Sequence, residues 1–209
     1  VLRTVDDVFL DLAHWSGIGR PRSTLATLRS LSASLDLYSA AMLCAQLRPI
    51  DELPLFSVSA SFVGKRNYSS EEMKFAIAEG IESQHSWSYT DNDRNADLNI
   101  RLFIEHEDAL LGLRLAQHAL HERSYKTMHY PGSLKPPVAA AMLRLAQLQA
   151  GQRLLDPFCG AGTILIEGAQ MGAIASGGDR DTQALSAAHG NADTAGVGIS
   201  LENWDARSM

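Results

Sequence analysis

The sequence contains few cysteines and no long hydrophobic segment. Its two cysteines, Cys44 and Cys159, lie far apart in 209 residues, which argues against a disulfide framework and against a cysteine zinc site. No apolar run approaches the roughly 20 residues of a membrane-spanning helix. With 45% hydrophobic residues, the composition predicts a globular protein of the reducing cytoplasm that has no membrane contact.

Clustered basic charge is also scarce. The net charge is -6 at pH 7, and residues 1–48 carry five basic and four acidic side chains, residues 49–130 eight and thirteen, and residues 131–209 five and seven. Proteins that bind the phosphate backbone of nucleic acids need clustered Lys and Arg. The chain has no basic arm, so any RNA contact is expected to depend on local patches.

The seven histidines do not show the spacing of metal ligands. His118 and His121 are expected to share a helix face, and the others are scattered without cysteine or carboxylate partners. Exposed or capping roles are therefore expected, and no metal site is predicted.

The chemistry of the sequence centres on a strand, a glycine turn and a helix. A short apolar strand at residues 153–155 ends at Asp156. Gly160 and Gly162 then allow a tight turn and a close approach to a ligand, because neither carries a Cβ atom. Thr163 is expected to start the helix, whose apolar positions pack against the sheet.

Two familiar phosphate-binding turns can be distinguished from this one. The dinucleotide fingerprint requires a third glycine where this chain has Leu165, and no Gly-Lys-Ser/Thr ending of a P-loop is present. The carboxylate of Asp156 would repel a pyrophosphate but would suit a ligand that carries an ammonium or sulfonium cation. An NAD-dependent enzyme is thus disfavoured.

The residues 156–163 (DPFCGAGT), followed by 166–169 (IEGA), resemble motif I of class I S-adenosyl-L-methionine-dependent methyltransferases, in the form found in amino-group RNA and DNA methylases. The resemblance implies that Asp156 and the two glycines line the methionine end of S-adenosylmethionine. Asp179 follows an expected strand at 173–175 at the distance at which an acid meets ribose hydroxyls. Asp205 lies in a stretch that resembles the next motif and would accept from the adenine amine. The implied cofactor residues are Ser133, Leu134, Asp156, Pro157, Phe158, Gly160, Gly162, Thr163, Asp179, Arg180, Asp205 and Ala206.

The region before this motif has α/β patterning. Residues 4–16 predict an amphipathic helix that ends at Gly17, and residues 23–47 predict a longer helix. The alternation in 55–63 predicts a strand. Ser69 and Glu72 form a capping box for the next helix. After a polar loop at 86–95, strands are expected at 96–104 and 109–115, joined by a turn at 105–108.

Residues 56–58, 64–68, 96–100 and 110–113 resemble a THUMP domain, an RNA-binding module that accompanies RNA methyltransferases. This resemblance implies an RNA-facing patch of Lys65, Arg66, Tyr68, Arg123 and Lys126. The proline-rich linker before an expected helix at 138–148 resembles the junction in the tRNA guanine-N2 methyltransferases of the THUMP class and in their ribosomal relatives, where Ser133 and Leu134 would lie over the cofactor.

The expected fold class is α/β, with an N-terminal ferredoxin-like/THUMP α+β region followed by the first half of a Rossmann-like class I methyltransferase domain. The expected divisions are a partial ferredoxin-like subdomain at 1–50, the THUMP domain at 51–122, a linker at 123–137 and the methyltransferase half at 138–209. The expected function is methylation of a guanine N2 amine in tRNA, bound at its acceptor end. The alternatives are ribosomal RNA as the substrate, or a non-catalytic RNA-binding module.

The resemblance also implies a limit. The family's acceptor motif, Asp/Asn-Pro-Pro-aromatic or Asn-Leu-Pro-Phe, does not occur before Met209, so no catalytic residue is assigned. The chain is expected to be truncated, with the strand at 153–155 paired on one side with 173–175 and bare on the other. We expect this half-domain to be aggregation-prone and inactive alone, and the intact protein to be a monomer.

Overall fold

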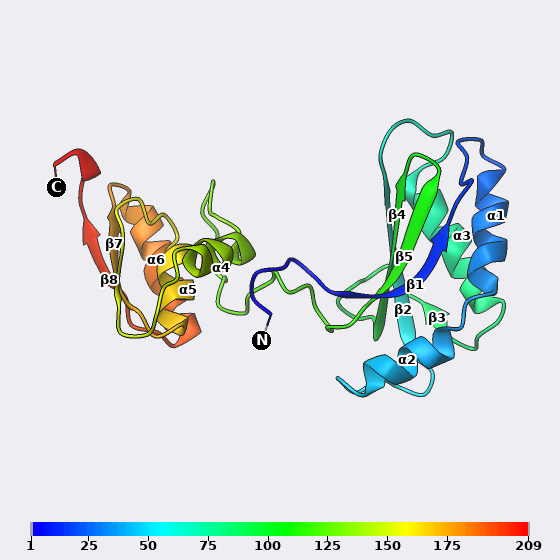
Figure 1. Ribbon diagram of the computed structural model, residues 1–209, viewed down its shortest axis with the longest axis horizontal. Helices are drawn as coiled ribbons and strands as arrows, with labels where there is room; N and C mark the ends of the chain where they lie inside the picture. The colour runs from blue at the N-terminus through cyan, green and yellow to red at the C-terminus, as the bar shows by residue number, and fades with distance from the viewer. Residues whose placement is uncertain (1, 209) are drawn as a thin grey trace. The chain divides into compact units, whose positions relative to one another are not determined.

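The computed structural model describes residues 2–208. The chain divides into two compact units (Figure 1). One comprises Asp7–His118, and the other joins the N-terminal segment before Asp7 to the chain from Ala119 onward. Each unit has its own sheet.

The unit formed by residues 7–118 contains a five-stranded mixed sheet in the order β1-β5-β4-β2-β3. The central strand β4 is antiparallel to β5 and parallel to β2. Helices α1 and α3 pack against each other beside the sheet (Figure 1). The elements are β1 (Phe9–Trp15), α1 (Thr24–Ala33), α2 (Leu37–Ala45), β2 (Leu55–Phe62), α3 (Ser70–Glu82), β3 (Ser88–Tyr89), β4 (Leu98–Glu105) and β5 (Asp108–Arg114).

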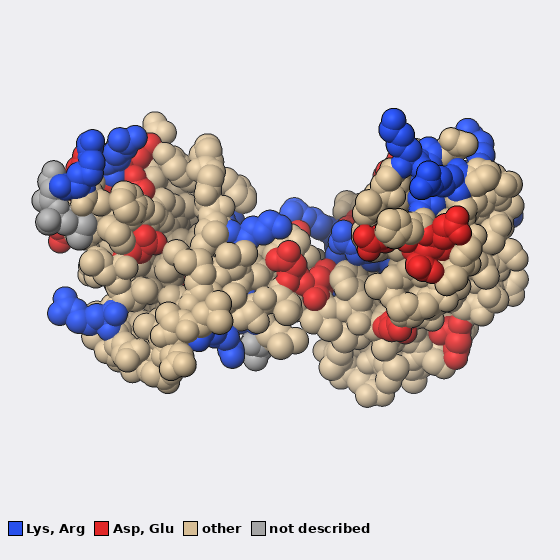
Figure 2. Space-filling model, turned by 45° about the horizontal axis from the view of Figure 1, so that its top comes forward, with Lys and Arg blue, Asp and Glu red and all other residues tan. Residues whose placement is uncertain are grey.

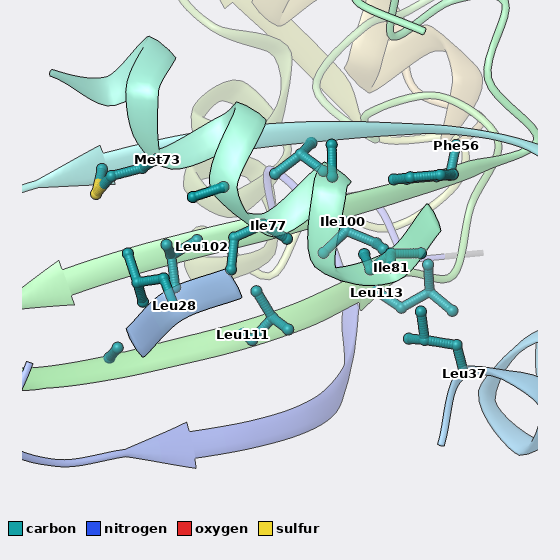
Figure 3. Packing of buried hydrophobic residues seen from close by; sticks show 14 of the residues in the cluster. Leu28, Leu37, Phe56, Met73, Ile77, Ile81, Ile100, Leu102, Leu111 and Leu113 are labelled. Atoms are coloured by element: carbon teal, nitrogen blue, oxygen red, sulfur yellow. The ribbon is translucent and has the colours of Figure 1, made fainter. Parts of the chain in front are cut away.

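The core of this unit lies between the helices and one face of the sheet (Figure 3). Leu28 of α1 and Ile77 of α3 are fully buried, as are Leu102 of β4 and Leu111 of β5. Leu102 and Leu111 are direct cross-strand partners. In β4 the residues facing the core are buried while Arg101 on the other face is exposed, as expected for a strand with one covered face.

Gly80 sets how closely α1 and α3 approach. A Cβ atom there would lie 2.0 Å from Ser32 Oγ and 2.3 Å from the Arg29 carbonyl oxygen. Because this space is free, the buried Ser32 hydroxyl can donate to the Ile77 carbonyl oxygen at 3.2 Å. Glycine is therefore required by the helix contact rather than by backbone conformation.

Several local predictions for this unit are confirmed. The strands expected at 55–63, 96–104 and 109–115 correspond to β2, β4 and β5. The capping box is present, since Ser69 N donates to Glu72 Oε2 at 2.9 Å and Glu72 N donates to Ser69 Oγ at 3.2 Å.

The prediction for residues 4–16 is wrong, because this segment contains the strand β1 and no helix. The spacing of its apolar residues is compatible with a helix or with a strand. The strand forms because the segment pairs antiparallel with β5, from Phe9 opposite Arg114 to Trp15 opposite Ala109. The helix expected at 23–47 is in fact two helices, because Asp36 accepts from Ser39 N at 3.1 Å and starts α2. The short strand β3 was not expected, and His118 and His121 lie outside any helix.

The second unit contains three parallel strands in the order β6-β7-β8, with α5 and α6 on the same face (Figure 1). As expected, β6 pairs with β7, which is its only strand partner among residues 2–208. The elements are α4 (Pro136–Leu145), β6 (Arg153–Asp156), α5 (Thr163–Gln170), β7 (Ile174–Asp179), α6 (Thr182–Ala195), β8 (Ser200–Asn203) and the short 3-10 helix η1 (Ala206–Ser208).

The two units divide the chain near residues 7 and 118. Strand β1 and helix α1 belong to the same unit as β2 to β5, so the expected boundary at residue 50 does not coincide with a boundary between compact units. Among residues 2–208, no helix combines the length and apolar character needed to cross a membrane.

Candidate functional site

The turn between β6 and α5 is shaped by two glycines with left-handed backbone. The φ angles of Gly160 and Gly162 are 52° and 76°, a region in which a Cβ atom is unfavourable. Gly162 is the N-cap of α5 and donates from its N to the Cys159 carbonyl oxygen at 2.8 Å. A Cβ atom on Gly162 would also lie 2.9 Å from Ala188 Cβ on α6. The expected start of the helix at Thr163 is confirmed.

Asp179 at the end of β7 holds this turn in place. Its Oδ2 atom accepts from Gly160 N at 3.0 Å, and its Oδ1 atom accepts from Asp181 N at 3.0 Å. One carboxylate thus connects the glycine turn to the start of α6. Further acceptor capacity remains on the two oxygens, because an ionised carboxylate offers about four lone-pair sites.

Asp156 lies at the end of β6, on the neighbouring strand. Its Oδ1 atom accepts from Phe158 N at 3.1 Å. Burial raises the pKa of Asp156 above the ordinary aspartate value, and the negative charge of Asp179 raises it further. Two carboxylates near each other at the strand ends create a site that favours a cation.

Two cavities lie beside the glycine turn, and Phe158, whose side chain is largely exposed, lines both. One has a volume of about 240 Å³ and lies between the turn and residues 130–134. The other, of about 380 Å³, lies at the ends of β7 and β8. Among the expected cofactor residues, the first cavity is lined by Ser133, Leu134, Asp156, Phe158, Gly160 and Thr163. The second is lined by Pro157, Phe158, Asp179, Arg180, Asp205 and Ala206.

Gly162 is the one expected cofactor residue that lines neither cavity. Its place is structural, because it starts α5 and packs against α6. The structure therefore gathers the remaining eleven residues around one turn, although they come from four separate segments of the chain.

Trp204 was not expected as a site residue but forms a wall of the larger cavity. Its Nε1 atom donates to the Pro157 carbonyl oxygen at 3.2 Å. A Cβ atom on Gly178 would lie 2.5 Å from the indole ring, so the glycine before Asp179 makes room for it. Asn203 Nδ2 donates to the Asp179 and Arg180 carbonyl oxygens at 3.1 Å each. The end of β8 is thus fixed to both the turn and β7.

Asp205 has a different environment from the other two acids. Arg207 Nε donates to both of its carboxylate oxygens, at 2.9 and 3.1 Å, and the hydrogen bond from Arg207 lowers the pKa of Asp205. Arg207 also lines the larger cavity. A ligand amine that bonds to Asp205 would therefore share the carboxylate with Arg207.

The smaller cavity has an available polar group. The Oγ atom of Ser133 is buried and has no hydrogen-bond partner, which is unusual for a buried hydroxyl. Together with the half-buried carboxylate of Asp156, it offers one donor or acceptor and one anion to a ligand. These groups fit an amino-acid moiety, which carries both an ammonium and a carboxylate.

Arg66 and Tyr68 of the expected RNA-facing patch both make hydrogen bonds within their own unit. Tyr68 is 4% exposed and its hydroxyl donates to the Gly19 carbonyl oxygen at 2.8 Å. The Arg66 guanidinium donates to the Ile18 and Gly19 carbonyl oxygens at 3.0 Å each and also to the His106 carbonyl oxygen. Both side chains hold the loops of the unit together; Tyr68 is buried and Arg66 is half-buried.

Arg123 and Lys126 have structural partners as well. Lys126 Nζ donates to the Leu134 carbonyl oxygen at 2.7 Å, and burial lowers the pKa of Lys126. Arg123 Nε donates to Glu167 Oε1 at 3.0 Å. Lys65 alone of the five expected residues is exposed without such a role. Lys65, Arg66 and Tyr68 belong to one compact unit and Arg123 and Lys126 to the other.

The partner of Arg123 is a buried carboxylate that the sequence did not reveal as special. Glu167 on α5 is 1% exposed, and it also accepts from Arg3 Nε at 2.9 Å and from the Tyr125 hydroxyl at 2.9 Å. Burial of the Tyr125 side chain raises its pKa, and the charge of Glu167 raises that pKa further. This cluster attaches the N-terminal segment and the linker to the helix that begins at the glycine turn.

Residues 123–209 match the family UPF0020, described as the RMKL-like methyltransferase domain. The chain is 34% identical over 124 residues, 56% of its length, to the ribosomal RNA large subunit methyltransferase K/L of Stutzerimonas stutzeri. It is 36% identical over 106 residues to the protein of the same name from Vibrio cholerae. The matched parts cover 17% and 15% of those relatives.

Solved structures extend the likeness over both units. TrmN from Thermus thermophilus matches with a TM-score of 0.69 and 28% identity, over 99% of this chain and 59% of that protein. A predicted N6-adenine-specific DNA methylase from Listeria monocytogenes matches with a TM-score of 0.71 and 19% identity, over 98% of this chain and 62% of that protein. The second likeness shows the fold alone. The chain is thus an α/β protein with the fold of these methyltransferase-related structures, and its residues 123–209 are similar to the RMKL-like methyltransferase domain.

Proposed function

We propose that this chain provides the cofactor-binding part of an S-adenosylmethionine-dependent RNA methyltransferase. The observation that carries the proposal is the pair of cavities on either side of the glycine turn, each bordered by the acid that ends a parallel strand. Ligands of open α/β sheets bind at the carboxyl ends of the strands. The match of residues 123–209 to a methyltransferase domain supports this assignment.

The residues suit the two halves of the cofactor. Asp156 and Ser133 would hold the methionine ammonium and carboxylate in the smaller cavity. Asp179 would accept from the ribose hydroxyls, while Trp204 and Phe158 border the space for the adenine in the larger cavity. When bound, S-adenosylmethionine supplies an electrophilic methyl group. The part of this chain in the reaction is to bind and orient it, because alignment of methyl group and acceptor carries much of such a reaction.

The proposed acceptor is a guanine N2 amine in ribosomal RNA. The sequence alone favoured tRNA, but the curated relatives are named for the large ribosomal subunit. We therefore prefer the ribosomal substrate and place tRNA second. The proposed setting is the cytoplasm.

The RNA-binding role that the THUMP resemblance implies is proposed for residues 7–118. Figure 2 shows Lys and Arg side chains gathered at one end of this unit. Lys65 and Arg20 are exposed, and their loops are joined by a hydrogen bond from Asn67 N to the Arg20 carbonyl oxygen at 3.0 Å. Arg20 is thereby added beside Lys65 in the proposed contact with RNA.

The test is methyl transfer from tritiated S-adenosylmethionine to large-subunit ribosomal RNA and to tRNA by the full-length protein, with calorimetric titration of S-adenosylhomocysteine. Asp179→Ala should weaken binding by about 1 to 3 kcal/mol, because it leaves ligand hydroxyls unpaired. The matched control is Asp193→Ala, which removes an exposed carboxylate of α6 that lines neither cavity. Equal affinity of the two variants, or absence of methyl transfer to either RNA, would contradict the proposal.

A further inference from the structure

The segment before α4 is held against α6 by one buried side chain. Asn191 is 1% exposed. Its Oδ1 atom accepts from Met128 N at 2.8 Å, and its Nδ2 atom donates to the Met128 carbonyl oxygen at 3.0 Å. Nδ2 also lies 3.3 Å from the Ala161 carbonyl oxygen in the glycine turn. Asn191 therefore binds the segment and the turn at the same time.

Two residues further along, Tyr130 makes a second attachment. Its hydroxyl donates to Asp181 Oδ2 at 2.6 Å. The other oxygen of Asp181 accepts from Gln183 N at 2.8 Å and caps α6. The backbone N of Asp181 donates to Asp179. The hydrogen bond raises the pKa of Tyr130 and lowers the pKa of Asp181, so the tyrosine is neutral and the aspartate ionised at physiological pH.

The segment that these attachments hold lines one cavity and not the other. Residues 130–134 line the smaller cavity, and none of them lines the larger one. At the far end of the segment, Lys126 holds the Leu134 carbonyl oxygen at 2.7 Å. Ser133, with its unpartnered hydroxyl, lies between the two fixed points. The segment 130–134 is consequently a wall whose position depends on contacts made outside the cavity.

We infer that Tyr130 and Asn191 are positioning residues that hold the segment 130–134 over the methionine half of the cofactor and leave its adenosine half unaffected. The inference rests on the proposed function. Tyr130 also lines the cavity, but its hydroxyl is bonded to Asp181 and acts through the segment. Their contribution should thus appear as selectivity between ligands that have an amino-acid chain and ligands that lack one.

The experiment measures two dissociation constants for each full-chain variant. S-adenosylhomocysteine contains both halves of the cofactor, whereas 5′-methylthioadenosine keeps the adenosine and the sulfur but lacks the amino-acid chain. Tyr130→Phe should raise the dissociation constant of S-adenosylhomocysteine by about 3- to 10-fold, which is the effect of one hydrogen bond. The dissociation constant of 5′-methylthioadenosine should change by less than about 2-fold. Tyr89→Phe is the matched control, since its hydroxyl donates to Asp91 at 3.1 Å in the other unit.

Variants of the acceptor separate positioning from a loss of folding. Asp181→Asn keeps one oxygen that can accept from Gln183 N and cap α6. Its amide NH2 then faces the Tyr130 hydroxyl, which can accept from it, so this variant should restore most of the selectivity that Asp181→Ala loses. In the double variant with Tyr130→Phe, Asp181→Ala should cost less selectivity than it does alone, because the two groups form one interaction. Asn191→Ser should lower selectivity in the same direction as Tyr130→Phe.

Equal weakening of both ligands by Tyr130→Phe, or no change in either, would overturn the inference while leaving the proposed function intact. Failure of the unsubstituted protein to bind either ligand would instead contradict the proposed function, and the inference with it. Fully additive effects of Tyr130→Phe and Asp181→Ala would show that the two residues act separately and would also overturn it.

Discussion

Replacement of Glu167 by alanine should destabilise the unit that contains the glycine turn. The carboxylate is 1% exposed and accepts from Arg3, Arg123 and Tyr125 at 2.9 to 3.0 Å. Its removal leaves two guanidinium groups without their counter-charge in a site where water has little access. Breaking a fully buried ion pair from one side costs about 3 to 5 kcal/mol.

The lower end of that range applies here. The side chains of Arg3 and Arg123 are 28% and 12% exposed, so water solvates them in part after the substitution. We expect Glu167→Ala to lower the free energy of unfolding by about 3 kcal/mol. Glu167→Gln should lower it by less, because the amide oxygen still accepts from one donor and no cavity forms.

Pulsed hydrogen exchange read by mass spectrometry across a urea series measures the two units separately. In Glu167→Ala, the urea concentration at the unfolding midpoint should fall for the amides of residues 153–203 and stay constant for those of residues 55–114. Glu79→Ala is the control, because the Arg29–Glu79 pair is more than half exposed on both sides and should contribute less than about 1 kcal/mol. A loss below about 1 kcal/mol for Glu167→Ala, or an equal loss in both units, would refute the reasoning.

Three further outcomes follow from the geometry. Gly162→Ala should lower the free energy of unfolding in urea by about 1 to 3 kcal/mol more than Gly196→Ala does. Both glycines have positive φ, but only a Cβ atom at Gly162 would approach Ala188, to 2.9 Å. Equal losses in the two variants would contradict the close contact. Asp156→Asn should raise stability at neutral pH, because burial raises the pKa of Asp156 and its ionised form disfavours folding. That gain in stability should disappear below about pH 3.9, where the carboxyl is protonated in both folded and unfolded chains. A stability gain seen only at low pH would contradict the raised pKa of Asp156. Lys65→Glu should weaken RNA binding and lower its salt slope without changing thermal unfolding; an unchanged slope would place the RNA contact elsewhere.

Local signals in the sequence were sufficient where one short segment contains the whole interaction. The capping box of Ser69 and Glu72 is complete within four residues. The glycine turn was predicted for a similar reason, since left-handed backbone at Gly160 and Gly162 is a property of the residues themselves. The sequence could therefore place the proposed site at the ends of β6 and β7 before the fold was known.

Predictions failed where distant residues decide the outcome. The N-terminal helix was wrong because β1 is set by its pairing with β5, about one hundred residues later. Arg66 looked like a phosphate ligand, but its partners are carbonyl groups of residues 18, 19 and 106. Nothing near Arg66 in the sequence indicates that these loops meet. The same holds for Glu167, whose partners come from two other segments.

Hydrogen exchange of the protein with and without S-adenosylhomocysteine tests the central assignment most directly. The account predicts slower exchange in 130–134, 156–163, 179–180 and 204–206, the segments that contribute most of the lining of the two cavities. Exchange in 55–114 should be unchanged. Binding without protection in these four segments, or protection confined to residues 7–118, would contradict the claim that the cofactor lies at the glycine turn.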